Sequence, residues 1–261
     1  MMKAEKKHVV SFSGGLCSFW TAMRVAEKYG TENMVLLFAD TMIEDEDLYR
    51  FNADVERLLG VPLTVVRDGR TPWEVFRDKR FLGNSRVDPC SAVLKRALLD
   101  RWKVANCDPS ETVMYMGLDW TEEHRLVRLR KRMPKWQVEA PMCEAPYWTK
   151  SRMVDECRML GIDPPRLYGM GFHHNNCGGF CVKSGHAQFA LLLRTMPERY
   201  AYHERMEQGM RVMLGDYGLG WGREKNVAIL NDRAGGGPRR PLTLKAFRER
   251  IEEGDANGLQ V

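Results

Sequence analysis

The first half of the chain alternates short apolar runs with amphipathic segments. Runs rich in β-branched and other apolar residues predict β-strands at 8–12, 34–39, 62–66 and 112–117. Apolar positions spaced three and four apart predict helices between them, at 18–29, 45–59 and 91–104. Gly30 and Gly60 follow two of these segments, where helices often end. Strands that alternate with helices predict an α/β fold with a doubly wound, mostly parallel sheet.

The pattern changes from about residue 134, where prolines become frequent and interrupt the apolar runs. Helices are predicted here at 149–160, 184–194, 197–210 and 243–253. Glycines gather beyond 215, which indicates a mobile loop or tail. The expected organisation is an α/β core at 1–135 and a smaller, mainly helical C-terminal region, divided into a part with a Cys-rich turn at 136–215 and a Gly/Arg-rich tail at 216–261.

Composition places the chain among ordinary globular proteins. It has 261 residues, of which 44% are hydrophobic and 29% charged. No segment resembles a signal peptide or has the apolar length that spans a bilayer, so the expected location is the cytoplasm, with no membrane partner. The chain has seven cysteines at irregular spacing, which in a reducing compartment argues against a disulfide framework. Metal binding, catalysis and simple burial remain as their roles.

The net charge of +5 is mild, but the basic residues are clustered. One short stretch contains Arg125, Arg128, Arg130, Lys131, Arg132 and Lys135. A glycine run near the end is flanked by Arg233, Arg239 and Arg240. Either cluster could bind the phosphates of a nucleic acid or of a nucleotide. The alternative is a solvated helix face.

The segment Ser13-Gly14-Gly15-Leu16-Cys17-Ser18 joins the first predicted strand to the first predicted helix. Two glycines let the backbone approach an anion closely, and the helix adds the positive end of its dipole. Ser13 and Ser18 add hydroxyl donors. The lysine and the spacing of a Walker A loop are absent. The segment therefore predicts an anion site of another kind.

A second chemical centre is predicted around Cys177 and Cys181, which lie four residues apart among glycines and histidines. Thiolates are natural ligands of iron–sulfur clusters. With His174 and His186 the same two cysteines could instead hold zinc. Reduced, unliganded thiols are the third interpretation. Burial or chance is assigned to Cys107, Cys143 and Cys157.

Several motifs, in this order along the chain, resemble those of one enzyme superfamily. Ser13-Gly14-Gly15-x-x-Ser18 resembles the loop of the adenine nucleotide alpha hydrolases, the PP-loop ATPases. The motifs that follow resemble the phosphoadenosine phosphosulfate reductase family within it: Phe38-Ala39-Asp40-Thr41, Cys90-Ser91-x-x-Leu94-Lys95, Tyr147-Trp148-Thr149, and Leu167-Tyr168-Gly169 leading to Cys177-x-x-x-Cys181. The resemblance covers roughly residues 8 to 195.

The resemblance implies a PP-loop fold, a Mg²⁺-assisted adenine nucleotide site and a 4Fe–4S cluster. The residues implied for ATP are Ser11, Ser13, Gly14, Gly15, Cys17, Ser18, Asp40 and Gly117. The cluster ligands implied are Cys90, Cys177 and Cys181, with one family ligand replaced by Pro89. Asp40 and Lys95 are the catalytic candidates. A lysine at position 95 could steer a phosphate, although it could equally be a surface residue.

Departures from the family decide between functions. The sulfonucleotide reductases carry a nucleophilic cysteine near the C-terminus, and this sequence has no cysteine after Cys181. Cys17 and Asp119 stand where the family often has aspartate and arginine. The favoured hypothesis is therefore an ATP-dependent enzyme that adenylylates an acceptor for sulfur transfer to a nucleic acid or nucleotide. A sulfonucleotide reductase and a non-catalytic nucleotide- or nucleic-acid-binding module are the alternatives. Expected partners are a sulfur donor protein and a second copy of the chain.

Overall fold

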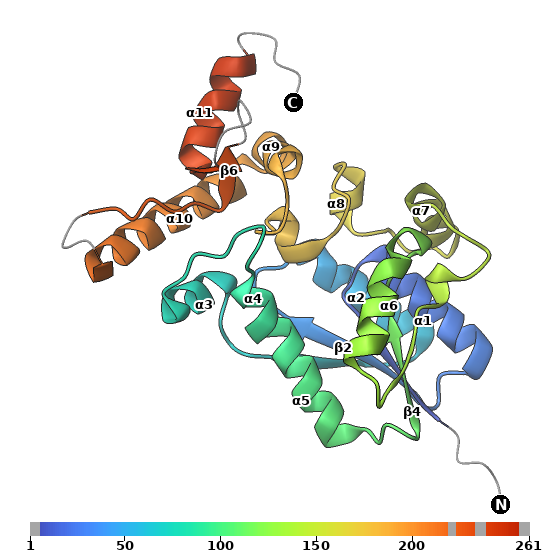
Figure 1. Cartoon of the computed structure of the whole chain (residues 1–261). Helices are drawn as coiled ribbons and strands as arrows, with labels where there is room; N and C mark the ends of the chain where they lie inside the picture. The colour runs from blue at the N-terminus through green and yellow to red at the C-terminus, as the bar shows by residue number, and fades with distance from the viewer. Residues whose placement is uncertain (1–5, 219–222, 233–238, 256–261) are drawn as a thin grey trace, which may run out of the picture.

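A parallel five-stranded sheet forms the centre of the molecule (Figure 1). The computed structural model describes residues 6–218, 223–232 and 239–255. The strands are ordered β3-β2-β1-β4-β5. Their bounds are β1 Lys7–Ser11, β2 Met34–Asp40, β3 Leu63–Arg67, β4 Thr112–Met116 and β5 Gln137–Glu139. The doubly wound α/β prediction is confirmed. The strand order reverses between β1 and β4, and such a switch point is where open α/β sheets bind ligands.

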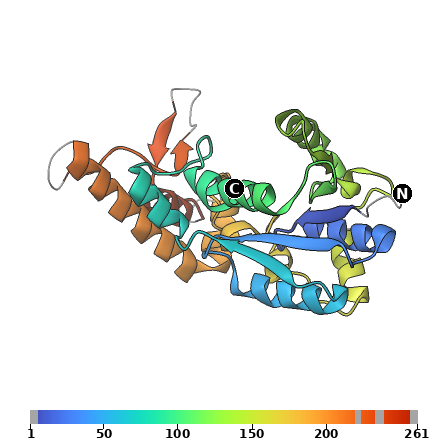
Figure 2. The ribbon, with the colours of Figure 1, turned by 90° about the horizontal axis from the view of Figure 1, so that it is seen from below.

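Helices cover both faces of this sheet (Figure 2). One face is covered by α1 Leu16–Tyr29, α2 Glu46–Leu59 and α7 Lys150–Met159. These helices bury Phe19, Phe51 and Met153 in a common core. The other face is covered by α5 Ala97–Asn106 and α6 Glu123–Arg132, where Leu126 packs with Met114 of β4. Burial on both faces explains why the strands appear as continuous apolar runs.

Local sequence signals set the ends of several elements. α1 ends at Gly30, which has a φ of 77°, and α2 begins at Asp45, whose carboxylate accepts the Asp47 amide. A capping box at Thr71 starts α3 Pro72–Lys79, a helix that the periodicity did not predict. The segment predicted as one helix at 91–104 is divided into α4 Pro89–Ser91, the π-helical turn Ala92–Arg96 and α5. Three 3₁₀ turns complete this part: Trp120–Glu122, Pro141–Cys143 and Asn176–Gly179.

The C-terminal region shares a core with α3. It contains α8 Arg166–Gly169, α9 His186–Thr195, α10 Pro197–Gly218, an antiparallel hairpin of β6 Leu230–Asp232 and β7 Arg240–Leu242, and α11 Leu244–Asp255. Phe180, Phe189 and Tyr200 pack there against Trp73 of α3. The predicted tail thus includes a hairpin and a helix, whereas Arg233 and its neighbouring glycines lie outside the described residues. Within the described ranges, every helix is too short or too polar to cross a bilayer.

Candidate functional site

The predicted anion loop lies at the switch point, between the end of β1 and the start of α1. Gly14 has a φ of 72°, and a Cβ there would come within 2.8 Å of Leu48. The Ser18 hydroxyl holds the loop closed: it accepts from the Ser13 amide at 3.1 Å and donates to the Gly15 carbonyl at 2.8 Å. Only glycine satisfies both the backbone angle and the close packing at position 14.

Two further residues press against this loop. Gly117 follows β4, and a Cβ there would lie 2.7 Å from Cα of Ser18 and 2.8 Å from its nitrogen. On the other side, the Tyr168 hydroxyl accepts the Leu16 amide at 3.2 Å. The first turn of α1 is therefore fixed between β4 and α8. A rigid loop of this kind presents backbone N–H groups to an anion without further reorganisation.

Cys17 lies in the first turn of α1 and contacts two charged side chains. Nζ of Lys150 is 2.6 Å from its sulfur, and Oδ2 of Asp119 is 3.6 Å away. Lys150 also pairs with Asp119 at 3.2 Å. Burial raises the pKa of the Cys17 thiol, and the Lys150 ammonium offsets part of that rise. For Asp119, burial would raise the pKa, but Thr121 and Lys150 lower it below its usual value.

A cleft of about 700 Å³ opens from the loop. Its lining includes Ser11, Ser13, Gly15, Cys17, Ser18 and Gly117. It also includes six cations against one carboxylate, namely Lys95, Arg96, Arg125, Arg128, Arg132 and Lys150 against Glu122. Three of the arginines lie on one stripe of α6, at spacings of three and four. The basic stretch of the sequence is thus partly a wall of this cleft rather than only a solvated face.

Asp40 lies outside the lining of this cleft, although it ends β2 beside β1. Its side chain is 2% exposed and accepts from Arg67 at 2.6 Å, from the Tyr49 hydroxyl at 2.8 Å and from the Met42 amide at 2.8 Å. These donors use both carboxylate oxygens. These contacts therefore make Asp40 a structural residue that holds the loop after β2. A catalytic role would require its carboxylate to give up these hydrogen bonds.

Lys95 projects from the π-helical turn toward the Cys-rich turn. It pairs with the buried Glu44 at 3.4 Å, and Glu44 in turn accepts the Cys177 amide and the Thr41 hydroxyl. Burial alone would lower the pKa of Lys95, but Glu44 and the nearby cysteines outweigh it and raise this pKa. A π-turn inside a helix often marks a functional position. Here the turn places Ser91, Lys95 and Arg96 together along the cleft.

The three predicted cysteines lie in one neighbourhood. The neighbouring Cys177 lowers the pKa of Cys181 to about 7, while its interaction with Cys181 and burial raise the pKa of Cys177 itself. Burial raises the pKa of Cys90 to about 11, and Cys181 adds to this rise. Cys177 and Gly178 both have left-handed backbone angles, with φ of 52° and 57°. The chain therefore turns sharply at these thiols.

A metal set is nevertheless not assembled. Across the described ranges no three His, Cys, Asp or Glu side chains are grouped so as to hold a metal ion. His186 contacts the Asn231 carbonyl at 3.1 Å and packs on Phe247, so it belongs to the C-terminal core. His174 lines the cleft, and its Nδ1 is buried with no partner among the described residues. The donor chemistry suits iron or zinc, but the thiols as they lie do not form such a site.

The sequence signals missed two residues of the site. Lys150 follows the N-cap of α7, and nothing in the local pattern shows that it reaches Cys17. Glu44 lies just before α2, close in sequence to Asp45 and Asp47, and nothing in the local pattern shows that it reaches Lys95 and the Cys177 amide. In the structure Asp45 pairs with Arg166 and Asp47 with Arg50. All three carboxylates are thus occupied by structural contacts.

With the geometry established, the chain can be compared with known proteins. No protein-family model and no curated protein matches it. Among solved structures, it is similar to phosphoadenylyl-sulfate (PAPS) reductase from Candida auris in a phosphate complex, at 14% identity and a TM-score of 0.45, over 63% of this chain and 78% of that one. It is also similar to NH₃-dependent NAD synthetase from Campylobacter jejuni, in complex with nitrate, at 12% identity and a TM-score of 0.41, over 82% and 84%.

Proposed function

We propose that the chain is a PP-loop enzyme that binds ATP in this cleft and adenylylates an acceptor. The observation that carries the proposal is the coincidence of the closed Ser13–Ser18 loop, the sheet's switch point and a cleft lined by six cations and one carboxylate. Backbone N–H groups and the α1 dipole would hold phosphates, and the cations would neutralise them. Such a site suits a nucleoside triphosphate better than an uncharged ligand.

The proposed step balances without a redox partner. An acceptor oxygen attacks the α-phosphorus of ATP, the bond from the α-phosphorus to the bridging oxygen breaks, and pyrophosphate leaves with that oxygen. The cations of α6 and Lys150 would stabilise the charge on the departing pyrophosphate. Mg²⁺ would enter with the phosphates; the carboxylate in the described lining is that of Glu122, which pairs with Arg125 and would exchange this partner for the ion. Hydrosulfide delivered by a donor protein would then attack the acceptor carbon that bears the adenylylated oxygen. The carbon–oxygen bond breaks, AMP leaves with that oxygen and the sulfur stays on the acceptor, which makes sulfur transfer the proposed outcome.

Release of pyrophosphate tests this function. The wild-type chain, ATP and Mg²⁺ are incubated with RNA, DNA or mononucleotide acceptors, and pyrophosphate is measured by a coupled assay. We expect acceptor-dependent release that Ser18→Ala abolishes and the exposed control Ser151→Ala leaves unchanged. Absence of release with all three acceptor classes would refute the proposal. Sulfite release from a phosphosulfate substrate would instead identify a sulfonucleotide reductase.

A separate part of the proposal concerns Cys90, Cys177 and Cys181. We propose that these thiols rearrange to bind a 4Fe–4S cluster. The proposal is supported by the proximity of the three thiols and by the low pKa of Cys181. No step above passes through it. Iron, sulfide and zinc are measured in protein purified without oxygen. Near four irons per chain, lost in Cys90→Ala and Cys181→Ala, would support the cluster; one zinc retained in Cys90→Ala, or no metal, would exclude it.

One observation favours a second candidate, nucleotide binding without turnover. Lys150 is engaged by Cys17 and Asp119, which stand where the family motif often has aspartate and arginine. A cation held in this way is less free to follow the charge that develops during phosphoryl transfer. Tight ATP binding by calorimetry, without pyrophosphate release under any acceptor condition, would support this candidate.

A further inference from the structure

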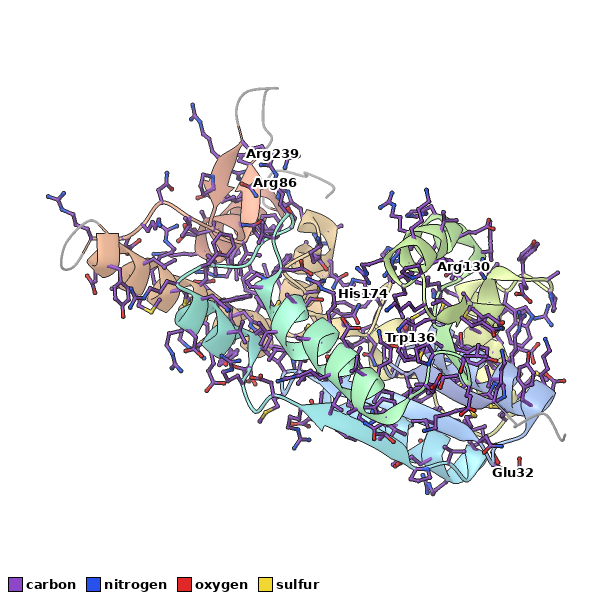
Figure 3. The ribbon with its side chains drawn as sticks, turned by 60° about the horizontal axis from the view of Figure 1, so that its bottom comes forward. Glu32, Arg86, Arg130, Trp136, His174 and Arg239 are labelled. Carbon is purple, nitrogen blue, oxygen red and sulfur yellow. The ribbon has the colours of Figure 1, made fainter. Side chains whose placement is uncertain are left out.

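A second cationic hollow lies outside the cleft, between the loop after α3 and the C-terminal hairpin. It has a volume of about 290 Å³, and its described lining contains four cations and no carboxylate: Arg80, Arg86, Lys225 and Arg239. Figure 3 shows Arg86 and Arg239 close together beside the C-terminal hairpin, apart from His174. The proposed reaction gives this hollow no role.

Arg86 and Arg239 are the cations of this hollow that can meet an outside anion, since the Arg80 guanidinium lies over the Tyr217 ring, 4.1 Å from its centroid. The nearby carboxylate of Glu224 is paired with Arg211 at 3.1 Å. Among the residues that the structure describes, Arg86 and Arg239 have no carboxylate partner, and both are exposed. The loop of Arg86 is itself ordered, because the Asn84 side chain accepts the Arg86 amide at 3.0 Å. The hollow therefore combines a defined backbone with unneutralised positive charge.

One short segment connects the hollow to the cleft. The loop at 80–88 runs directly into α4 and the π-turn, where Ser91, Lys95 and Arg96 line the cleft. Arg96 reaches back toward the loop, with Nη1 3.5 Å from the Asp88 carboxylate. Cations are thus present in the hollow, at the junction and along α6. A single phosphate or nucleotide would occupy only one of these places, whereas a polymer of phosphates could occupy all of them.

An exposed aromatic pair adds a second kind of contact. Trp120 is 47% exposed and Tyr147 is 60% exposed, and their rings lie 6.0 Å apart. Trp120 begins the 3₁₀ turn that carries Glu122 to the cleft. Exposed aromatic rings beside basic residues are typical of surfaces that stack unpaired bases. The pair favours a single-stranded segment over a duplex, whose bases are already stacked.

We infer that the acceptor is a nucleic acid with a single-stranded segment, and that the hollow of Arg80, Arg86, Lys225 and Arg239 binds its backbone phosphates away from the reacting nucleotide. This inference rests on the proposed function, since it identifies the acceptor of that reaction. RNA and DNA offer the same phosphodiester chemistry to the hollow, and the test below separates them.

Binding is measured by fluorescence polarisation with labelled single-stranded RNA and DNA of about 20 nucleotides, over a series of KCl concentrations and without ATP. Each phosphate contact removed should lower the salt slope by about 0.7 for a single strand. We therefore expect Arg86→Ala/Arg239→Ala to weaken binding on the order of tenfold at 0.1 M KCl and to flatten the slope by about 1.4. Both residues are exposed, so the variant should fold.

The matched control is Arg57→Ala/Arg158→Ala, which removes the same charge from exposed positions on α2 and α7. Its slope and affinity should match the wild type. Equal losses in both double variants, no binding of either nucleic acid, or equal binding of poly-glutamate through the same arginines would each overturn the inference. Preference for RNA or for DNA would support it and name the acceptor.

Failure of this inference can be distinguished from failure of the proposed function. Calorimetric ATP binding should be unchanged in Arg86→Ala/Arg239→Ala, because neither residue lines the cleft. Loss of ATP binding in that variant would mean that the substitutions disturb the fold of the cleft, and would overturn the assignment. Nucleic-acid binding that depends on the hollow, without pyrophosphate release, would preserve the phosphate site and refute only the chemistry.

Discussion

Replacing Gly117 by alanine should damage the phosphate loop through steric contact alone. The added Cβ would lie 2.7, 2.8 and 2.9 Å from Cα, N and Cβ of Ser18. Carbon atoms pack at about 3.5–4.0 Å, so the first turn of α1 would have to move by about 0.8 Å or more. The obstructing atoms are mainly backbone atoms, and no flexible side chain can turn away to make room.

The expected cost follows from this displacement. Overpacking a tight site costs about 1–3 kcal/mol, which should appear as a lower urea midpoint with an unchanged m value. Moving the Ser18 backbone also misplaces donors aimed at a phosphate, and a hydrogen bond to a charged group contributes about 1.5–3 kcal/mol. ATP affinity should therefore fall about 10- to 100-fold.

The assay is urea unfolding together with calorimetric ATP binding. Gly209→Ala is the matched control, because Gly209 lies inside α10 with open space around its Cβ position. Alanine there should be neutral or should stabilise the chain by up to about 1 kcal/mol, with ATP affinity unchanged. If Gly117→Ala matched the wild type in both stability and affinity, the close approach of β4 to α1 would not be what shapes the site.

Three other perturbations test separate parts of the structure. Asp40→Asn should lower the free energy of unfolding, measured in urea, by about 1–3 kcal/mol, because two N–H donors of the Arg67 guanidinium lose their charged acceptor. Full stability of this variant would contradict the structural role of Asp40. The buried His203 accepts a hydrogen bond from Trp73, and burial lowers its pKa, so its contribution to stability is fully present above pH 6.5 and is lost as pH falls. The free energy of unfolding of the wild type should therefore fall, relative to that of His203→Gln, by up to about 1.4 kcal/mol per pH unit. Equal pH slopes for the two proteins would refute this. Lys150→Met should slow the alkylation of Cys17 by iodoacetamide at pH 8, because the Lys150 ammonium lowers the pKa of the Cys17 thiol. The rate is measured by mass spectrometry, and an unchanged rate would show that the contact does not influence the thiol.

The central strands β1, β2 and β4 were predictable because they are buried on both faces. Continuous apolar runs such as Val9-Val10 and Leu36-Leu37 are 0–1% exposed, so their chemistry is visible without knowledge of their neighbours. The turn at Ser13–Ser18 was equally visible, because its glycines and serines lie within six residues of one another and close the loop between β1 and α1; that it binds phosphate stays a prediction. The apolar pattern itself does not give the order of the strands in the sheet; only the rules for parallel connections limit it.

Short and polar elements were not predictable in this way. α6 buries only Leu126, and its many arginines hide the helical period. β5 has three residues, of which Val138 alone is buried. The apolar residues of α3 pack against Phe180, more than a hundred positions away in sequence. The core that buries α3 is therefore completed by the distant C-terminal region, and the local sequence does not show it.

The two candidate centres differ in what sequence can say about them, and the difference is physical. At the phosphate loop, backbone geometry makes the site, and the residues that shape that geometry are mostly local. At the Cys-rich turn, chemistry depends on whether Cys90, Cys177 and Cys181 point at one place, and this is decided by distant contacts: Glu44 holds the Cys177 amide, and Arg199 of α10 lies over Gly178, where a Cβ would collide with its guanidinium. These contacts fix the backbone of the turn, yet within the described residues no three metal-ligating side chains are grouped so as to hold a metal ion. A cluster would require the three thiols to rearrange, so metal content, rather than ligand spacing, must decide whether this turn is a redox centre or a support for Lys95 beside the cleft.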